Sequence, residues 1–230
     1  MIERFSKELD NMPWPMVHFA ISEILSFGDP SPNLLLGSIS PDAIHMRGQI
    51  SREEKGVTHL VHNGKLPNKE LIMERYREYL PKRMEPEWKS FVVGYFSHIY
   101  TDLRWTETIY TDFENNYNGD KNEIRKTYNN EVSQVEFYLL RALESKDKLL
   151  VKLEQAKGYS VDPFLTQLEI NQYRDCKINW LEDLNNEPQI TPIYFKNDKV
   201  MNFIRETAKE FLYLNKEWNI ECFEDGRNIS

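Results

Sequence analysis

Apolar residues recur at helical spacing along most of this chain of 230 residues, and this periodicity restricts the fold more than any other feature. A helix that buries one face carries an apolar residue at every third or fourth position. The pattern predicts helices over 15–27, 69–80 and 87–108. Three long amphipathic helices follow: one over about 121–153 with a candidate break near Ser145, one beginning at Asp162-Pro163, and one carrying the apolar residues between Val200 and Leu214. Only 189–195 alternates like a strand, so the sequence predicts an all-α fold.

No repeat, low-complexity stretch or domain boundary interrupts this pattern. The chain length and a hydrophobic share of 40% supply enough apolar surface for one substantial core. We therefore predict a single all-α domain over residues 1–230. The two cysteines, Cys176 and Cys222, have no CxxC partner, which argues against a disulfide framework and against a thiolate zinc site.

The net charge of −8 argues against affinity for duplex nucleic acid or anionic membranes, both of which favour basic patches. It leaves room for a small phosphate-bearing substrate, because a bound metal can supply local positive charge. Residues 1–8 contain no apolar signal core, and no stretch has the length of a transmembrane segment. These features predict a cytoplasmic location and leave the oligomeric state open.

All five histidines fall in the first hundred residues. His98 precedes Asp102 by four residues inside the most apolar predicted helix, so the two side chains share one helix face. A carboxylate that faces a core is costly unless its charge is compensated. A divalent metal would compensate it and would also use the neighbouring imidazole.

Each candidate ligand also has an ordinary structural interpretation. His98 and Asp102 can form a buried hydrogen-bonded pair, and Asp42, which follows Pro41, can cap a helix or form an Asx-turn. His59 and His18 can sit at the edges of apolar faces, while His45 and His62 are best interpreted as surface residues. Taken together, the candidates have the residue types of a site for a divalent metal with nitrogen and oxygen ligands: His18, Asp42, His59, His98 and Asp102.

The order of these pieces resembles the zinc-dependent phospholipase C family and the related zinc single-strand nucleases. The resemblance covers about residues 14–105 and comprises His18 on an N-terminal helix, the segment Gly37-Ser38-Ile39-Ser40-Pro41-Asp42, the pair Thr58-His59, and the Gly-x-x-x-His-x-x-x-Asp spacing from Gly94 to Asp102. It implies an all-α fold in which Asp42, His59, His98 and Asp102 hold one metal. It also implies that His18 helps to hold a second metal, which Asp102 bridges.

Two departures from the family pattern limit the expected metal content. The family coordinates metal with an N-terminal tryptophan, whereas Trp14 is internal, and this chain has no histidine after His98 from which to build a further His-His-Glu site. We therefore expect one or two divalent ions, zinc first, with manganese, iron and nickel also compatible with these ligands.

These expectations lead to hydrolysis of a phosphoester, either a phosphodiester or a phosphomonoester, by metal-activated water, with Asp42 or an unliganded carboxylate accepting the water proton. Arg47, Lys55 and Arg104 are candidates for phosphate contacts, with plain surface charge as the favoured interpretation of each. One alternative is a non-catalytic helical protein with a structural or degenerate metal site. A second alternative is an HD-type phosphohydrolase, which requires an adjacent His-Asp pair that none of the five histidines forms.

Overall fold

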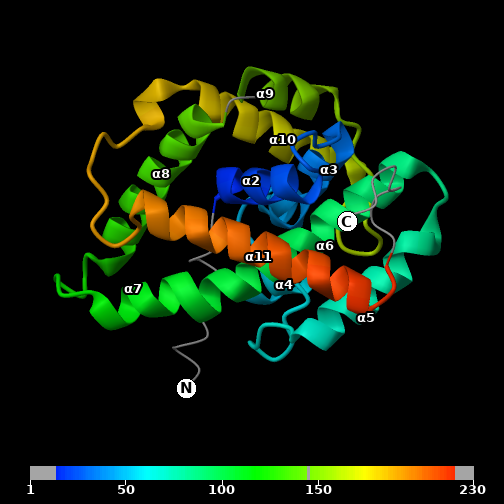
Figure 1. Ribbon diagram of the computed structural model, residues 1–230, viewed down its shortest axis with the longest axis horizontal. Coiled ribbons are helices and arrows are strands. Elements are labelled where there is room, and N and C mark those ends of the chain that lie inside the picture. The colour runs from blue at the N-terminus through cyan, green and yellow to red at the C-terminus, as the bar shows by residue number, and fades with distance from the viewer. Residues whose placement is uncertain (1–13, 144–145, 221–230) are drawn as a thin grey trace, which may run out of the picture.

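The structure, a computed structural model, describes residues 14–143 and 146–220, and every regular element in these ranges is a helix (Figure 1). The predicted all-α class is therefore confirmed for the part of the chain that is described. The α-helices are α2 (Pro15–Leu25), α3 (Pro32–Gly37), α4 (Arg52–Thr58), α5 (Lys69–Tyr79), α6 (Pro86–Trp105), α7 (Thr111–Asn116), α8 (Ile124–Ala142), α9 (Lys146–Gln155), α10 (Gln167–Glu182) and α11 (Asn197–Glu217). Shorter elements are the 3-10 helices η1 (Ser40–Arg47), η2 (Leu80–Lys82) and η4 (Leu184–Asn186), and the π-helix η3 (Thr106–Tyr110), which joins α6 to α7.

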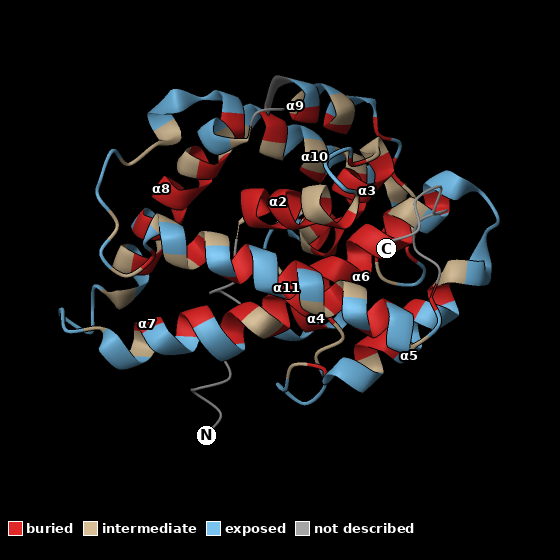
Figure 2. Ribbon diagram, in the orientation of Figure 1, coloured by how far each residue is buried: buried red, intermediate tan, exposed pale blue. Residues whose placement is uncertain are grey.

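Helix α2 lies at the centre of the arrangement and packs against α3, α6, α8 and α11 (Figure 1). Nine of its eleven residues are buried, so it lacks a solvent-facing side, as expected for a helix enclosed by neighbours. Figure 2 shows the same enclosure in colour, with α2 and the middle of α6 buried and the outer faces of α5, α9 and α11 exposed. His18 is carried into the interior by this central helix.

Helix α6 is the second central element. Every residue from Phe91 to Leu103 is buried, including four polar ones. Ser97 and Thr101 donate their hydroxyl hydrogens to carbonyls of the same helix, which satisfies these donors without an outside partner. His98 and Asp102 are therefore the polar groups that α6 presents to the interior.

Two glycines allow α3 and α6 to cross at very short range. A Cβ atom at Gly94 would lie 2.3 Å from the Leu34 carbonyl oxygen, and one at Gly37 would lie 2.1 Å from the Phe91 carbonyl oxygen. No side chain fits in this space, because real Cβ atoms do not approach backbone so closely. The crossing brings the chain after α3, with Ser38 and then η1, against the face of α6 that carries His98.

Several local expectations are corrected by the structure. The helix expected to begin at Asp162-Pro163 begins instead at Gln167, where Thr166 and Glu169 form a capping box. A Ser/Thr side chain followed three residues later by glutamate satisfies two end groups at once and outweighs the Asp-Pro signal. Segment 189–195, the expected strand, is irregular, whereas the charged segment over 45–56, which the sequence alone suggests is a surface loop, belongs in part to η1 and α4.

The long helix expected over 121–153 is divided into α8 and α9, whereas its expected break near Ser145 lies outside the described residues, as do residues 1–8 and Cys222. All the buried hydrophobic side chains of the described part except Phe137 form one core cluster. None of the helices described here combines the length and apolar character needed to cross a bilayer.

Candidate metal centre

Four elements bring the five predicted ligands into one cluster. His18 comes from α2, Asp42 from η1, His59 from the residue after α4, and His98 and Asp102 from α6. The ligating atoms of Asp42, His59 and His98 all lie within 4.8 Å of one another, and so do those of His18, His98 and Asp102. Residues separated by up to 84 positions in the sequence thus form two overlapping three-residue groups that can hold a metal ion.

The shortest distances join the atoms that would act as ligands. His98 Nε2 lies 3.1 Å from Asp102 Oδ2 and 3.2 Å from His59 Nε2. His59 Nε2 lies 3.4 Å from Asp102 Oδ2 and 3.5 Å from Asp42 Oδ1. Ligands around a tetrahedral zinc ion at its usual bond lengths are about 3.4 Å apart. Four of the six distances among these four residues are therefore close to those between the ligands of a tetrahedral site.

The imidazole rings are oriented by backbone carbonyl groups. His98 Nδ1 lies 2.7 Å from the Ser38 carbonyl oxygen, and His59 Nδ1 lies 3.1 Å from that of Lys55. A carbonyl only accepts, so each Nδ1 carries the hydrogen in the neutral tautomer and each Nε2 lone pair faces the cluster. Metal-binding histidines are usually held by this kind of hydrogen bond from the second ring nitrogen.

Two nitrogen lone pairs 3.2 Å apart repel each other unless a proton or a cation lies between them. Among the described residues, neither oxygen of the neighbouring Asp102 has a hydrogen-bond partner of good geometry. The donor set therefore fits a divalent cation, in which case all of these atoms become ligands.

Neighbouring charges within the cluster shift the pKa values of Asp42 and His98 in opposite directions. Burial works to raise the pKa of Asp42, but the contact with His59 and the positive charges of His98 and Lys55 hold that pKa well below its usual range. Burial works to lower the pKa of His98, but Asp102, Asp42 and the Ser38 carbonyl raise it above its ordinary value. A proton and a metal ion would therefore compete for His98.

His18 lies beside this group rather than within it. Its ring is stacked on that of His98, with the centroids 4.0 Å apart, and its Nε2 lies 3.6 Å from Asp102 Oδ1. This is the opposite carboxylate oxygen from the one that faces His59 and His98. Asp102 thus has one oxygen toward each group, which is the geometry that a bridging carboxylate needs.

Among the described residues, the cluster reaches solvent through Asp42. His18, His59, His98 and Asp102 are at most 2% exposed, whereas the Asp42 side chain is 16% exposed. His45, with its side chain 42% exposed, lies outside Asp42 at 4.0 Å. Any molecule that reaches the cluster must therefore approach past Asp42 and His45.

The surroundings of the other residues considered as ligands or phosphate contacts do not indicate a binding role as clearly. His62 is exposed and belongs to a tight turn in which its backbone bonds to that of Lys65, in agreement with its interpretation as a surface residue. Arg47 pairs with Glu169, and Arg104 pairs with Glu107 and Glu210. Lys55 is buried and close enough for its charge to act on Asp42.

Two residues of the second half of the chain also reach this region, and sequence reasoning missed both. The Tyr173 hydroxyl on α10 donates a long hydrogen bond of 3.4 Å to Asp42 Oδ2. Glu136 on α8 is fully buried and accepts a hydrogen bond from the backbone N–H of Met16, two residues before His18. Each occupies a position with ordinary helical periodicity, so no sequence signal separates them from core residues.

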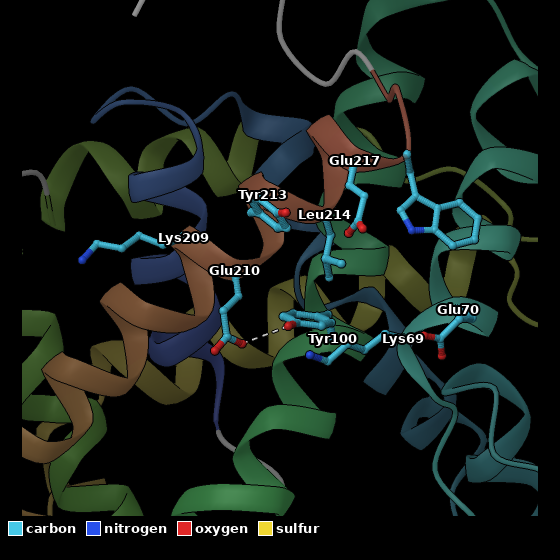
Figure 3. A pocket seen from close by; sticks show the side chains of 9 residues that line it. Lys69, Glu70, Tyr100, Lys209, Glu210, Tyr213, Leu214 and Glu217 are labelled. Atoms are coloured by element: carbon cyan, nitrogen blue, oxygen red, sulfur yellow. Dashed lines mark hydrogen bonds between the residues drawn. The ribbon is translucent and has the colours of Figure 1, made fainter.

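A wide hollow lies away from the cluster, between α5, α6 and α11 (Figure 3). It has a volume of about 650 Å³ and is lined by Lys69, Glu70, Tyr100, Lys209, Glu210, Tyr213, Leu214, Glu217 and Trp218. Tyr100 lies midway between His98 and Asp102 in sequence and so projects from the opposite side of α6. This hollow does not give access to the candidate ligands.

No family model, curated protein or solved structure matches this chain. The resemblance to zinc-dependent phospholipase C therefore stays a prediction from the sequence segments that carry it.

Proposed function

We propose that the protein is a metal-dependent hydrolase of phosphoesters. The observation that carries the proposal is the convergence of Asp42, His59, His98 and Asp102 in one cluster with ligand-atom distances of 3.1 to 3.5 Å, in which Asp42 is the partly exposed member. The resemblance of the same segments to zinc-dependent phospholipase C supports a phosphoester as the substrate. Zinc is the expected ion, and manganese, iron or nickel would also suit imidazole and carboxylate ligands.

When bound, a divalent metal would supply Lewis acidity and lower the pKa of a water molecule toward neutrality. The residues of the chain have distinct tasks. His59, His98 and Asp102 hold the ion from the closed side. Asp42 is ionised at neutral pH, lies on the open edge and is the residue placed to accept a proton from the attacking water.

A second ion is proposed between His18 and the Oδ1 oxygen of Asp102. This pair offers fewer ligands than the first group, because His98 directs its single available nitrogen toward His59 and Asp102 Oδ2. We therefore expect the first site to fill before the second and the metal content to lie between one and two equivalents.

The competing function is a structural metal site in a non-catalytic protein. It is favoured by the burial of four of the five ligands, since structural sites are closed and catalytic sites keep an open position. The two functions make different predictions for a substrate that reaches the open edge. Hydrolysis requires turnover, whereas a structural ion stabilises the fold without turnover.

The deciding experiment measures metal by elemental mass spectrometry in the wild-type protein, in His98→Ala and in the control His62→Ala. We expect one to two equivalents in the wild type and in the control, and less than about a tenth of that in His98→Ala, because its ring supplies a central ligand. Retention of metal in His98→Ala would contradict the site.

The loaded protein is then assayed with bis(p-nitrophenyl) phosphate and with p-nitrophenyl phosphate. Turnover that disappears in His98→Ala and persists in His62→Ala supports the hydrolase. A full metal content without turnover of either ester supports the structural alternative.

A further inference from the structure

The accessible edge of the cluster faces helix α10, which packs directly against η1. Tyr173 on this helix is 4% exposed, and its hydroxyl touches the Oδ2 oxygen of Asp42. One helical turn later, Lys177 places its ammonium nitrogen 5.0 Å from the centroid of the Tyr173 ring. The two residues share one face of the helix, so the ammonium group lies beside the approach to Asp42.

Lys177 has no ion-pair partner among the described residues, and its recorded contact is with the face of the Tyr173 ring. Two of the basic residues that the sequence offered as candidates for phosphate contacts are already paired, Arg47 with Glu169 and Arg104 with Glu210. In a protein with a net charge of −8, an ammonium group at the mouth of a site without a carboxylate partner is available to an incoming anion.

A second positive charge reinforces the first. Lys55, one turn before His59, acts on Asp42, and both Lys55 and Lys177 contribute to the lowered pKa of His45, to which burial contributes most. The exposed ring of His45 therefore stands within the electrostatic reach of both lysines. Positive charge gathers at the one edge through which a substrate can reach the cluster.

Of Lys55 and Lys177, the lysine whose ammonium group is more accessible to a ligand is Lys177. It is half-buried on the last turns of α10, whereas Lys55 is 9% exposed and belongs to the buried wall behind His59. The aromatic ring beneath Lys177 restricts its side chain without neutralising it. A lysine held in this way binds phosphate as a point charge.

We propose that Lys177 is a substrate-binding residue that recognises an anionic oxygen of a phosphoryl group as that group approaches Asp42. This assignment rests on the proposed function and deepens it, because it restricts the substrate to phosphoesters that keep a negatively charged phosphoryl oxygen. It also assigns a substrate-binding role to α10, a role that the sequence pattern of this helix does not indicate.

The test uses inorganic phosphate as the probe and the metal-loaded protein as the receptor. Affinity is measured by isothermal titration calorimetry for the wild type, Lys177→Gln, Lys177→Arg and Lys126→Gln. Lys126 is a matched control because it lies on α8, away from α10, where its side chain is 72% exposed and pairs with Glu123. Metal content and thermal unfolding are recorded for each variant.

We expect Lys177→Gln to bind phosphate about tenfold more weakly than the wild type, the usual size of one charge-assisted contact. Lys177→Arg keeps the charge and is expected to stay within about threefold of the wild type, while Lys126→Gln is expected to match it. The affinity of the wild type should also fall more steeply with salt than that of Lys177→Gln, because one ionic contact has been removed.

Two results overturn the proposal in distinguishable ways. If Lys177→Gln holds its metal and binds phosphate as the wild type does, the role of Lys177 is wrong while the hydrolase proposal stands. If the wild type holds no metal, the proposed function fails and this inference fails with it. Should Lys177→Gln unfold, Lys177→Met, which removes the charge and keeps the apolar stem, is measured in its place, and a phosphate affinity equal to that of the wild type overturns the role of Lys177.

Discussion

Two carboxylates in the core of this protein have contrasting neighbours. Asp102 is surrounded by the imidazoles of His18, His59 and His98. Glu136 receives one hydrogen bond from the N–H of Met16, and its second oxygen has no hydrogen-bond partner among the described residues. The first environment surrounds a carboxylate with imidazole nitrogens, whereas the second removes water from a carboxyl group and gives it a single donor in return.

Glu136→Gln should change how stability depends on pH. Burial raises the pKa of Glu136 from an ordinary 4.5 to about 8, against the opposing effects of the Met16 N–H and of Lys177. Below pH 4.5 the acid is protonated in both the folded and the unfolded chain. Between the two pKa values only the unfolded chain ionises, so the wild type loses stability as pH rises.

The variant cannot ionise and should therefore be the more stable protein at pH 9, with an upper bound on the order of 5 kcal/mol, and should resemble the wild type at pH 4.5. Urea unfolding of the metal-free proteins at both pH values measures the difference. The control is Glu123→Gln, at an exposed glutamate on the surface. Parallel pH profiles for wild type and Glu136→Gln would show that Glu136 does not titrate as described.

The residues of the site were predictable from sequence to the extent that their types were unusual. Histidine and aspartate inside an apolar helical segment are costly without compensation, and this identified His98 and Asp102. Tyr173 and Lys177 gave no such signal, because a tyrosine and a lysine are ordinary residues of an amphipathic helix. Their role appears only when packing sets α10 against η1.

At the scale of elements, the crossing of α3 and α6 positions the site. The Gly37 and Gly94 contacts hold the Ser38 carbonyl against His98 Nδ1 at 2.7 Å. The next residues form η1 and carry Asp42. A change in the separation of α3 and α6 would therefore displace both Asp42 and the Ser38 carbonyl group that orients His98.

Gly94→Ala should destabilise the protein by about 3 kcal/mol and reduce its metal content. The added methyl group would lie 2.3 Å from the Leu34 carbonyl oxygen and 2.7 Å from the Ser38 nitrogen, and both are backbone atoms that cannot turn aside. Denaturant unfolding and elemental mass spectrometry give the two readouts.

Gly119→Ala is the matched substitution, because its methyl group would meet the end of the flexible Tyr117 side chain. Equal stability of the two alanine variants would show that the helix crossing tolerates a side chain at Gly94.

The elements themselves were predictable where helical periodicity was strong and uninterrupted. The last helix, with its apolar residues from Val200 to Leu214, was located correctly, and so were the helices now labelled α2 and α5. The start of α10 was wrong because two helix-start signals compete within 162–169 and the capping box of Thr166 prevails. The sequence gives no means of ranking such signals before tertiary contacts form.

For the whole molecule, the first metal ion would link η1, the residue after α4 and α6, and the second would add α2. Binding to the folded state alone raises stability by mass action, by about 4 kcal/mol when free metal exceeds its dissociation constant a thousandfold. For a protein of this size that gain corresponds to roughly 10 °C in Tm.

Removing the metal with a chelator should accordingly lower the Tm of the wild-type protein by about 10 °C, and restoring the metal should recover it. His98→Ala should melt at the same temperature with and without the chelator, since it lacks the central imidazole. Differential scanning calorimetry measures all four conditions. An unchanged Tm in the wild type would indicate that the cluster is stable without an ion.

The contact between α2 and α11 joins the two ends of the described chain, because the first and last described helices lie against each other (Figure 1). During synthesis the segments that carry all five ligands leave the ribosome well before α11 exists. Until then the central helix lacks one of its walls and presents apolar surface to water. Productive folding of this chain therefore depends on long-range closure, which is slow, and the unfinished chain is the form most exposed to aggregation.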